Sequence, residues 1–393
     1  MIAKMLNLSG ITIVKTVFID NELHITCASA FSEVLCPICK KKITRAPNSY
    51  ERVIQDLSCF ERKVYLHLQI RQLNCKDCSE YFTEPFYFVD KGATQTNRYE
   101  EYIYQSCKGG DFQSVSKKEN LGWHTVKRIF NKLAERKLKV TDRFSNVKIL
   151  GIDEFSLKKG HKDFACVLVN LETNCVIDIL RDRKKDFLVT YFKSKGKEFC
   201  DGIEVLSSDM WEGFTTLTKE TFPNAELVID RFHFFMHLNK ALDSCRKELK
   251  KSLFKDLELH QGKLRFALLK PIEKLTIKEL EIKDAAFEIS LDLKIFYSMK
   301  EELRRIFNQK IEISIAFEKV NKWVEQAEIF NNKHLNKFLN TLSNWKTGIM
   351  NFFKHRVTNG KVEGKNNKIK MIKRRGFGYL NFDNFRIRVL SEC

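Results

Sequence analysis

Three carboxylates occupy unusual settings in this sequence. Asp153 ends the apolar run of KILGIDEFSL, where an acid is costly unless it is paired or bound to a metal ion. Asp209 follows the apolar run of EVLSSDMWEGF, and Glu363 is the lone acid among seven basic residues between Lys361 and Arg375. A carboxylate beside cations can hold a divalent metal ion while the cations hold phosphates. Two such ions, about 3.5–4 Å apart, promote phosphoryl transfer.

Each acid also has an ordinary structural explanation. Asp153 would fit the exposed end of its strand, and Asp209 would cap a following helix. Asp230, in ELVIDRFHFF, also lies between a strand and a helix, and a cap or an ion pair is its default interpretation. Glu363 would fit a surface salt bridge. Strand alternation sends Asp153 and Glu154 to opposite faces, so we do not expect both to serve one site.

The segment around Glu363 has helical spacing. A polar stripe consists of Glu363, Asn367, Lys370 and Arg374. A neighbouring apolar stripe, able to pack on a sheet, consists of Val362, Ile369 and Ile372. Thr358 or Asn359 can cap the start of this helix, and an acid in its first turn suits the helix dipole. The residues expected to hold DNA phosphates here are Lys370, Lys373, Arg374 and Arg375.

Four of the twelve cysteines form two C-x-x-C pairs, Cys36 with Cys39 and Cys75 with Cys78. Two such pairs complete the tetrahedral four-sulfur shell that Zn²⁺ prefers, and the pattern favours a closed structural site. Alternating residues 63–73 predict a strand leading to the second pair. A disulfide pair or a redox motif would use the same residues. Basic residues follow Cys39 where Gly or Ser is usual, so the sequence does not fix the conformation of the turn at the first cysteine pair.

Residues 111–138 have the pattern of a helix-turn-helix. Val126, Ile129, Phe130 and Leu133 recur at helical spacing after a turn at residues 121–123. The residues that lie off this apolar stripe and are expected to face DNA are Thr125, Lys127, Arg128 and Lys132. A small helical pair with a basic outer face would show the same pattern.

The overall composition favours a polyanionic partner. Lys and Arg number 69 against 50 Asp and Glu, a net charge of +19. Such a field attracts nucleic acid, and a membrane surface is the alternative. No apolar run approaches the roughly 18 residues of a membrane span, and no signal peptide is recognised. We therefore expect a cytoplasmic, nucleoid-associated bacterial protein that binds double-stranded DNA and no membrane.

Strand-like and helical segments predict a multidomain α/β (α+β) protein. Three strands are followed by helix, strand, helix and strand between residues 147 and 231, which predicts a mixed sheet. Residues 232–340 are helical and charged. The expected divisions are a zinc-binding domain (1–92), a helix-turn-helix region (93–146), a first core part (147–231), a helical insertion (232–340) and a second core part (341–393).

The chain resembles bacterial insertion-sequence transposases with an RNase H-like DDE core. The resemblance is to the family with an N-terminal zinc-binding domain, a helix-turn-helix and a helical insertion before the last acid. It runs from residue 36 to residue 390 over five ordered blocks. The blocks are CPIC…RQLNCKDCSEYFTEPF, ILGIDEFSLKKGHKDF, VLSSDMWEGF, ELVIDRFHF…LNKALDSCR and TNGKVEGKNNKIKMIKRRGFGY.

The resemblance implies that Asp153, Asp209 and Glu363 are the catalytic acids and hold two Mg²⁺ or Mn²⁺ ions. It implies hydrolysis at the terminal inverted repeats of the element, followed by attack of the 3′-hydroxyls on target DNA. Asp230 and His233 would be supporting residues, and the protein would act as a homo-oligomer in a synaptic complex.

Two other functions compete with this one. An RNase H-fold nuclease such as a resolvase would keep the acids and metal ions but lack strand transfer. A DNA-binding regulator would lack catalysis altogether, and the three intact acids argue against it.

Overall fold

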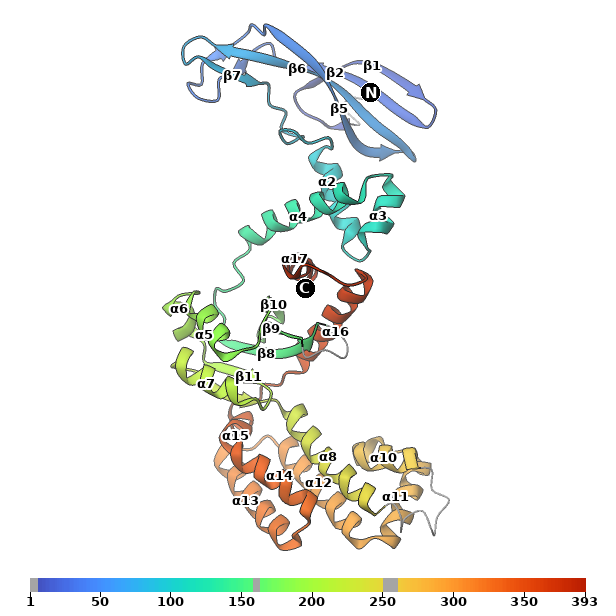
Figure 1. Cartoon of the computed structure of the whole chain (residues 1–393), viewed down its shortest axis with the longest axis vertical. Helices are drawn as coiled ribbons and strands as arrows, with labels where there is room; N and C mark the ends of the chain where they lie inside the picture. The colour runs from blue at the N-terminus through green and yellow to red at the C-terminus, as the bar shows by residue number, and fades with distance from the viewer. Residues whose placement is uncertain (1–5, 158–162, 250–260) are drawn as a thin grey trace. The chain divides into compact units, whose positions relative to one another are not determined.

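The computed structural model describes residues 6–157, 163–249 and 261–393 (Figure 1). The chain divides into two compact units. The first contains the chain up to Thr141 with residues 375–379 and 392, and the second contains residues 142–374, 380–391 and 393. The expected division at 146/147 lies close to this boundary, and the other expected divisions lie inside the units. No helix among the described residues combines the length and the apolar character needed to cross a lipid bilayer.

A five-stranded sheet forms the first part of unit one. Its strands follow the order β1-β2-β6-β5, with β7 paired to β6. Val64, Leu66 and Leu68 alternate into the core from β6, which confirms the strand expected at residues 63–73. A short hairpin of β3 and β4 holds the first cysteine pair in its loop. The strands are β1 (Ile11–Ile19), β2 (Glu22–Ser29), β3 (Val34–Leu35), β4 (Lys42–Ile43), β5 (Asn48–Cys59), β6 (Arg62–Cys75) and β7 (Glu80–Thr83).

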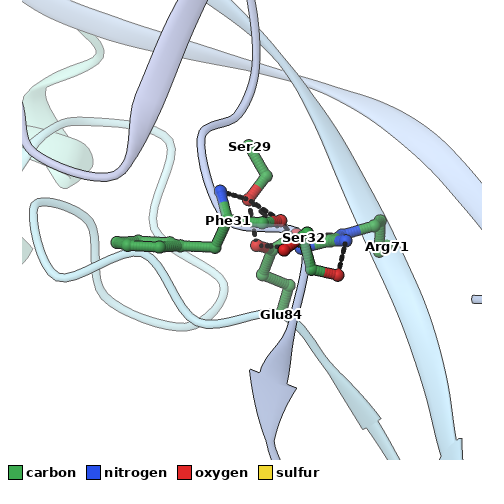
Figure 2. Close-up of polar contacts among 5 residues, drawn as sticks. All are labelled: Ser29, Phe31, Ser32, Arg71 and Glu84. Atoms are coloured by element: carbon green, nitrogen blue, oxygen red, sulfur yellow. Dashed lines mark hydrogen bonds and ion pairs between the residues drawn. The ribbon is translucent and has the colours of Figure 1, made fainter. Parts of the chain in front are cut away.

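A buried ion pair fixes the segment that leads from β2 to this hairpin. Figure 2 shows Arg71 of β6 facing Glu84 just after β7, with two guanidinium–carboxylate hydrogen bonds of 2.8 Å. The Ser29 hydroxyl donates to the same carboxylate, and Arg71 also donates to the carbonyl oxygens of Phe31 and Ser32. The Glu84 side chain is 3% exposed. Bidentate pairing compensates for the cost of burying its charge.

Three helices complete unit one: α2 (Asn97–Cys107), α3 (Phe112–Glu119) and α4 (Trp123–Val140). Helix α2 is fastened to the sheet through the buried carboxylate of Asp56. That carboxylate accepts hydrogen bonds from the hydroxyl of Thr96, the N-cap of α2, and from Arg98. Asp56 thus holds the start of α2 on the sheet, together with backbone hydrogen bonds of Gln55 with Thr94 and Thr96.

A mixed five-stranded sheet forms the centre of unit two. Its order is β10-β9-β8-β11-β12, with β8, β9 and β10 antiparallel and β8, β11 and β12 parallel. The RNase H-like mixed sheet expected from the sequence is confirmed. The single helix expected between the third and fourth strands is two helices, α5 and α6. The elements are β8 (Ile149–Ser156), β9 (Phe164–Asn170), β10 (Cys175–Leu180), α5 (Lys185–Lys193), α6 (Lys197–Gly202), β11 (Val205–Ser208), α7 (Glu212–Thr221) and β12 (Glu226–Ile229).

Helices follow the last strand and pack Phe296, Trp323 and Phe338 into a core that also includes Val228 and Ile229 of β12. Asn351 donates to the Leu227 carbonyl, which ties α15 to β12. The expected end of the insertion at residue 340 falls inside α14. The helices are α8 (Arg231–Glu248), α10 (Gln261–Leu269), η1 (Ile272–Lys274), α11 (Ile277–Ile289), α12 (Leu291–Asn308), α13 (Ile313–Phe330), α14 (Lys333–Asn344) and α15 (Lys346–His355).

The chain returns to the sheet through α16 (Gly360–Arg375) and α17 (Phe382–Glu392). Val362, Ile369 and Ile372 are buried, so the expected apolar stripe of α16 is confirmed. Val362 packs on β8 at Gly151: a Cβ at this glycine would lie 2.8 Å from Val362 Cγ2 and 3.0 Å from a methyl carbon of Leu171. The absence of a side chain at residue 151 lets the helix approach the strand.

We expect Gly151→Ala to destabilise unit two by about 1–3 kcal/mol, because the added methyl group overpacks the α16–β8 contact. Val362→Ala should also destabilise the protein, through lost burial. The double variant should lose less unfolding free energy than the two single variants lose in sum, because the smaller side chain at residue 362 makes room for the methyl group at residue 151. Urea unfolding of the four proteins measures this coupling. Strictly additive costs would show that the two residues do not press on each other.

Candidate active site

The four cysteines of the two pairs lie together in unit one. The Sγ atoms of Cys36 and Cys78 are 3.4 Å apart, as are those of Cys39 and Cys75, and all four lie within 4.8 Å of one another. Tetrahedral zinc with bonds of about 2.3 Å places sulfur atoms about 3.8 Å apart. The four thiolates therefore fit a structural zinc ion. Among the described residues this is the only group of three or more potential ligands so close together.

The backbone of each cysteine knuckle turns through a left-handed residue directly after its second cysteine. These residues are Lys40, with φ of 61°, and Ser79, with φ of 55°. Lys40 therefore adopts the conformation for which glycine is usual, which answers the question that its basic side chain raised. Burial raises the pKa of the Cys36 thiol, but hydrogen bonds with the backbone N–H groups of Cys39 and Ile38 and with neighbouring thiols together lower this pKa to about 7. A lower pKa favours the thiolate form that binds metal.

The helix-turn-helix has the expected form. Helix α3 ends at Asn120 in the left-handed conformation, and α4 begins after Gly122. Val126, Ile129 and Phe130 are fully buried. The turn therefore places the first residues of α4 on the outer side of the pair.

The residues predicted to face DNA on α4 separate into two kinds. Arg128 is exposed, Thr125 and Lys127 are half-buried, and the Lys127 ammonium lies 5.2 Å from the centre of the Trp123 ring. Lys132 instead forms ion pairs with Glu100 at 2.5 Å and Asp90 at 2.9 Å.

Because the Glu100 side chain is only 1% exposed, Lys132 balances a buried charge. The ion pairs of Lys132 with Glu100 and Asp90 are therefore structural contacts within unit one.

Asp153 lies on β8 at the centre of the mixed sheet. Its Oδ1 accepts a hydrogen bond of 2.8 Å from the backbone N–H of Glu154, and its Oδ2 accepts one of 2.6 Å from Asn366 of α16. Burial raises the pKa of this carboxyl group, and the hydrogen bonds and the charge of His233 oppose that effect. Asp153 is thus held between the strand and α16, and it does not lie at a solvated strand end.

Asp209 follows β11, next to β8 in the sheet. It does not cap α7: the N-cap is Trp211, and Asp209 Oδ1 is buried without a hydrogen-bond partner in the described part of the chain. Burial raises its pKa to about 6, and the charges of Glu154 and Asp153 add to this rise, whereas His233 opposes it. The structure therefore brings Asp153 and Asp209 into one electrostatic environment.

Glu154 contributes a further negative charge near Asp209. Glu154 alternates away from Asp153 as expected, but its charge affects the pKa of Asp209 more than the charge of Asp153 does. Its Oε2 accepts from Arg183 at 2.5 Å, and its Oε1 is buried with no partner among the residues described. The strand pattern alone did not reveal this neighbour because Asp209 comes from a different strand.

Asp230 links the start of α8 to the start of α16. It occupies the N-cap position of α8, but its side chain makes no capping bond there. Instead, its Oδ1 accepts a hydrogen bond of 3.0 Å from the backbone N–H of Asn359, and the Asn359 side chain donates to the Ile152 carbonyl. Asp230 is 3% exposed. Neither the expected capping bond nor an ion pair is its main contact among the described residues.

Glu363 lies in the first turn of α16 and is exposed. It lines a cavity of about 460 Å³ together with Asp230 and with Arg231 of α8 and Lys300 and Arg304 of α12. Its helix carries Asn366 one turn later, and residues so spaced lie about 5–6 Å apart. Glu363 therefore projects from the same helix that holds Asp153, beside a cavity edged by cations.

The basic residues of α16 have different surroundings. Lys370 and Arg374 are exposed. Lys373 donates to the carbonyl oxygens of Ser156 and Leu157 at the end of β8, and burial lowers its pKa. Arg375 pairs with Glu392. Lys373 thus fastens the helix, whereas Lys370 and Arg374 are open to a ligand.

A family model for DDE transposases of the ISL3 type matches residues 150–389, more than half of the chain. The chain belongs to this family. Models for the helix-turn-helix domain of ISL3 transposases and for the zinc finger of IS204/IS1001/IS1096/IS1165 transposases match residues 84–134 and 32–78. The ISL3-type match includes Asp153, Asp209 and Glu363.

Two transposases are similar to this chain over much of its length. The transposase for insertion sequence element IS1001 of Bordetella parapertussis is 28% identical over 360 residues, which are 91% of this chain and 88% of that protein. The transposase for element IS1557 of Mycobacterium tuberculosis is 24% identical over 284 residues, 66% of this chain and 63% of that protein. This ISL3-family chain is accordingly an enzyme, a DDE transposase with a zinc finger and a helix-turn-helix.

Sequence reasoning missed one residue of this site. Asn366 lies on the buried stripe of α16, four residues after Val362 and three before Ile369, and it is 3% exposed. An amide at an apolar stripe position is the signal that would have found it, because a buried amide needs a partner.

We expect Cys36→Ser and Cys75→Ser each to remove about one zinc ion per chain, because the remaining thiolates no longer complete a tetrahedral shell. Metal analysis of the purified proteins measures the loss, and Cys200→Ser, at a buried cysteine of unit two, is the control that should retain zinc. Zinc-free wild-type protein prepared without chelator would contradict the structural zinc site.

Proposed function

We propose that this transposase binds the terminal inverted repeats of an insertion sequence, cleaves at its ends and joins the resulting 3′-hydroxyls to target DNA. Asp153, Asp209 and Glu363 are the catalytic acids. The observation that carries this proposal is Asp209 Oδ1, which is buried and has no hydrogen-bond partner among the described residues, in a carboxyl group whose pKa the charge of Asp153 raises. A buried acid without a partner is costly, and a bound cation would offset that cost.

The acids fit divalent metal ions. Carboxylate oxygens are the ligands that Mg²⁺ and Mn²⁺ prefer, and Asp209 Oδ1 and Glu154 Oε1 are buried acceptors for which the described residues supply no donor. Two bound ions would stabilise the negative charge on the attacking and leaving oxygens. Asp153 and Asp209 would hold them from the sheet and Glu363 from α16, with Asp230 and His233 as supporting residues.

The reaction itself consists of two displacements at phosphorus. In the first, a water oxygen attacks the phosphate at the end of the element, the bond to the 3′-oxygen breaks, and a free 3′-hydroxyl leaves. In the second, that 3′-hydroxyl attacks a target phosphate and displaces another 3′-oxygen. The chain orients both displacements by holding phosphates on the cations Lys370 and Arg374.

DNA recognition would divide between the two units. The zinc finger and helix-turn-helix would bind the terminal repeats, with Thr125, Lys127 and Arg128 at the DNA and Lys132 as their structural support. The exposed cations of α16, Lys370 and Arg374, would bind DNA near the acids. The helical insertion would cover the cleaved strand, and two or more copies would assemble in the synaptic complex.

We expect Lys127→Ala and Arg128→Ala to weaken binding to terminal-repeat DNA more than binding to random DNA, by about 1–3 kcal/mol for a base contact. Lys139→Ala removes the same charge from an exposed position at the far end of α4 and should weaken both equally. Titrations of the full chain with the two DNAs at fixed salt measure the difference. If all three variants lose the same affinity for both DNAs, α4 contacts only phosphates and does not read bases.

Glu363→Gln should reduce cleavage and strand transfer by roughly 10²–10³-fold or more, because a neutral amide stabilises the metal and the leaving oxygen poorly. DNA binding should stay the same or improve slightly, because one carboxylate leaves a basic segment. Glu204→Gln is the control: its exposed pair with Lys148 contributes about 0–1 kcal/mol.

Cleavage of a terminal-repeat duplex with Mg²⁺ and joining of pre-cleaved ends to plasmid measure the two steps. Near-normal cleavage by Glu363→Gln would overturn the assignment, and Asp230, which lines the same cavity, would be the next acid to test. Cleavage without joined products would favour a nuclease.

A further inference from the structure

Asn366 holds the carboxylate of Asp153 from the helix that carries Glu363. Its Nδ2 donates to Asp153 Oδ2 at 2.6 Å, and the backbone N–H of Glu154 donates to Asp153 Oδ1 at 2.8 Å. Among the described residues, each carboxylate oxygen thus accepts one hydrogen bond. An ionised carboxylate oxygen has two lone-pair sites, so each oxygen keeps one for another ligand. The two donors fix the plane of the carboxylate without blocking it.

The buried position of the Asn366 amide has a free-energy cost. The side chain is 3% exposed, between the buried Val362 and Ile369, and its Oδ1 has no hydrogen-bond partner within the described ranges. An apolar residue would pack here without that unpaired acceptor. Packing alone therefore does not account for an amide at residue 366, whereas a donor aimed at Asp153 does.

We infer that Asn366 is a positioning residue for the transposition reaction. It orients Asp153 for a divalent metal ion and fixes the register of α16 against β8, which places Glu363 one helical turn earlier. This inference rests on the proposed function, because it assigns Asn366 to the site built by Asp153, Asp209 and Glu363. Residues that orient a metal ligand typically change metal affinity or activity about 10–100-fold when they are replaced.

Asn366→Leu is the sharpest test, because leucine suits the buried stripe and a helix but cannot donate. The full-length variant should fold, with an unfolding midpoint equal to or above that of the wild type. Its affinity for Mn²⁺, titrated without DNA by calorimetry, should fall about 10–100-fold. The Mg²⁺ concentration for half-maximal cleavage should rise to match, while binding to terminal-repeat DNA stays unchanged.

Ile369→Val is the matched control, because it loosens the same buried stripe without touching Asp153. It should lower the unfolding midpoint and leave Mn²⁺ affinity and the Mg²⁺ requirement unchanged. If Asn366→Leu keeps wild-type Mn²⁺ affinity and Mg²⁺ requirement, or if Ile369→Val reproduces its effects, Asn366 acts through packing and the inference is overturned.

Asp153→Asn separates this inference from the proposed function. If Asp153→Asn loses cleavage and Mn²⁺ binding while Asn366→Leu keeps the Mn²⁺ affinity and Mg²⁺ requirement of the wild type, only the positioning role is refuted. Full cleavage by Asp153→Asn would refute the proposed site and, with it, any role for Asn366 in that site.

Discussion

The close packing of α16 on β8 is the contact on which the arrangement of the acids depends. The helix runs along the strand in the same direction, with Val362 at Gly151, Asn366 at Asp153 and Lys373 at Ser156. From residue 362 to 373 the helix rises about 16 Å, and from residue 151 to 156 the strand rises about 16 Å. The rise of α16 therefore matches the rise of β8 over this length. Contacts at both ends hold the first turn of α16, which carries Glu363, against the strand.

Burial of the carboxylates imposes the next constraint. Asp209 and Glu154 each carry an oxygen without a donor among the described residues, and the charges of Asp153 and Glu154 both raise the pKa of Asp209. Carboxylates that are partly buried near one another lose hydration and repel, and both effects disfavour their charged forms. His233 opposes the effect only in part. A site with this balance favours cations, which agrees with the chemistry of a DDE transposase.

The sequence predicted the features that depend on local pattern. Two C-x-x-C pairs predicted the cysteine cluster, a 3.6-residue repeat predicted α4, and segments rich in Val, Ile and Leu predicted the strands of the mixed sheet. Contacts between distant segments were not predictable in the same way. Spacing placed Lys132 off the apolar stripe of α4, but its partner Glu100 is a buried acid of another helix. Alternation separated Glu154 from Asp153 but gave no information about Asp209, which follows a neighbouring strand.

The basic character of α16 now has a physical explanation that the count of charges alone did not supply. Lys361 and Lys373 donate to carbonyl oxygens of Leu171, Ser156 and Leu157, so these two cations fasten the helix to the ends of strands. Sheet carbonyls that lie beyond the hydrogen-bonding ladder need donors, and long side chains on a packed helix supply them. The remaining exposed cations are then separate in function from the anchors. Glu363 therefore lies beside cations of two kinds. Lys361 and Lys373 donate to backbone carbonyl oxygens of the sheet, whereas Lys370 and Arg374, on the polar stripe of Glu363, face solvent.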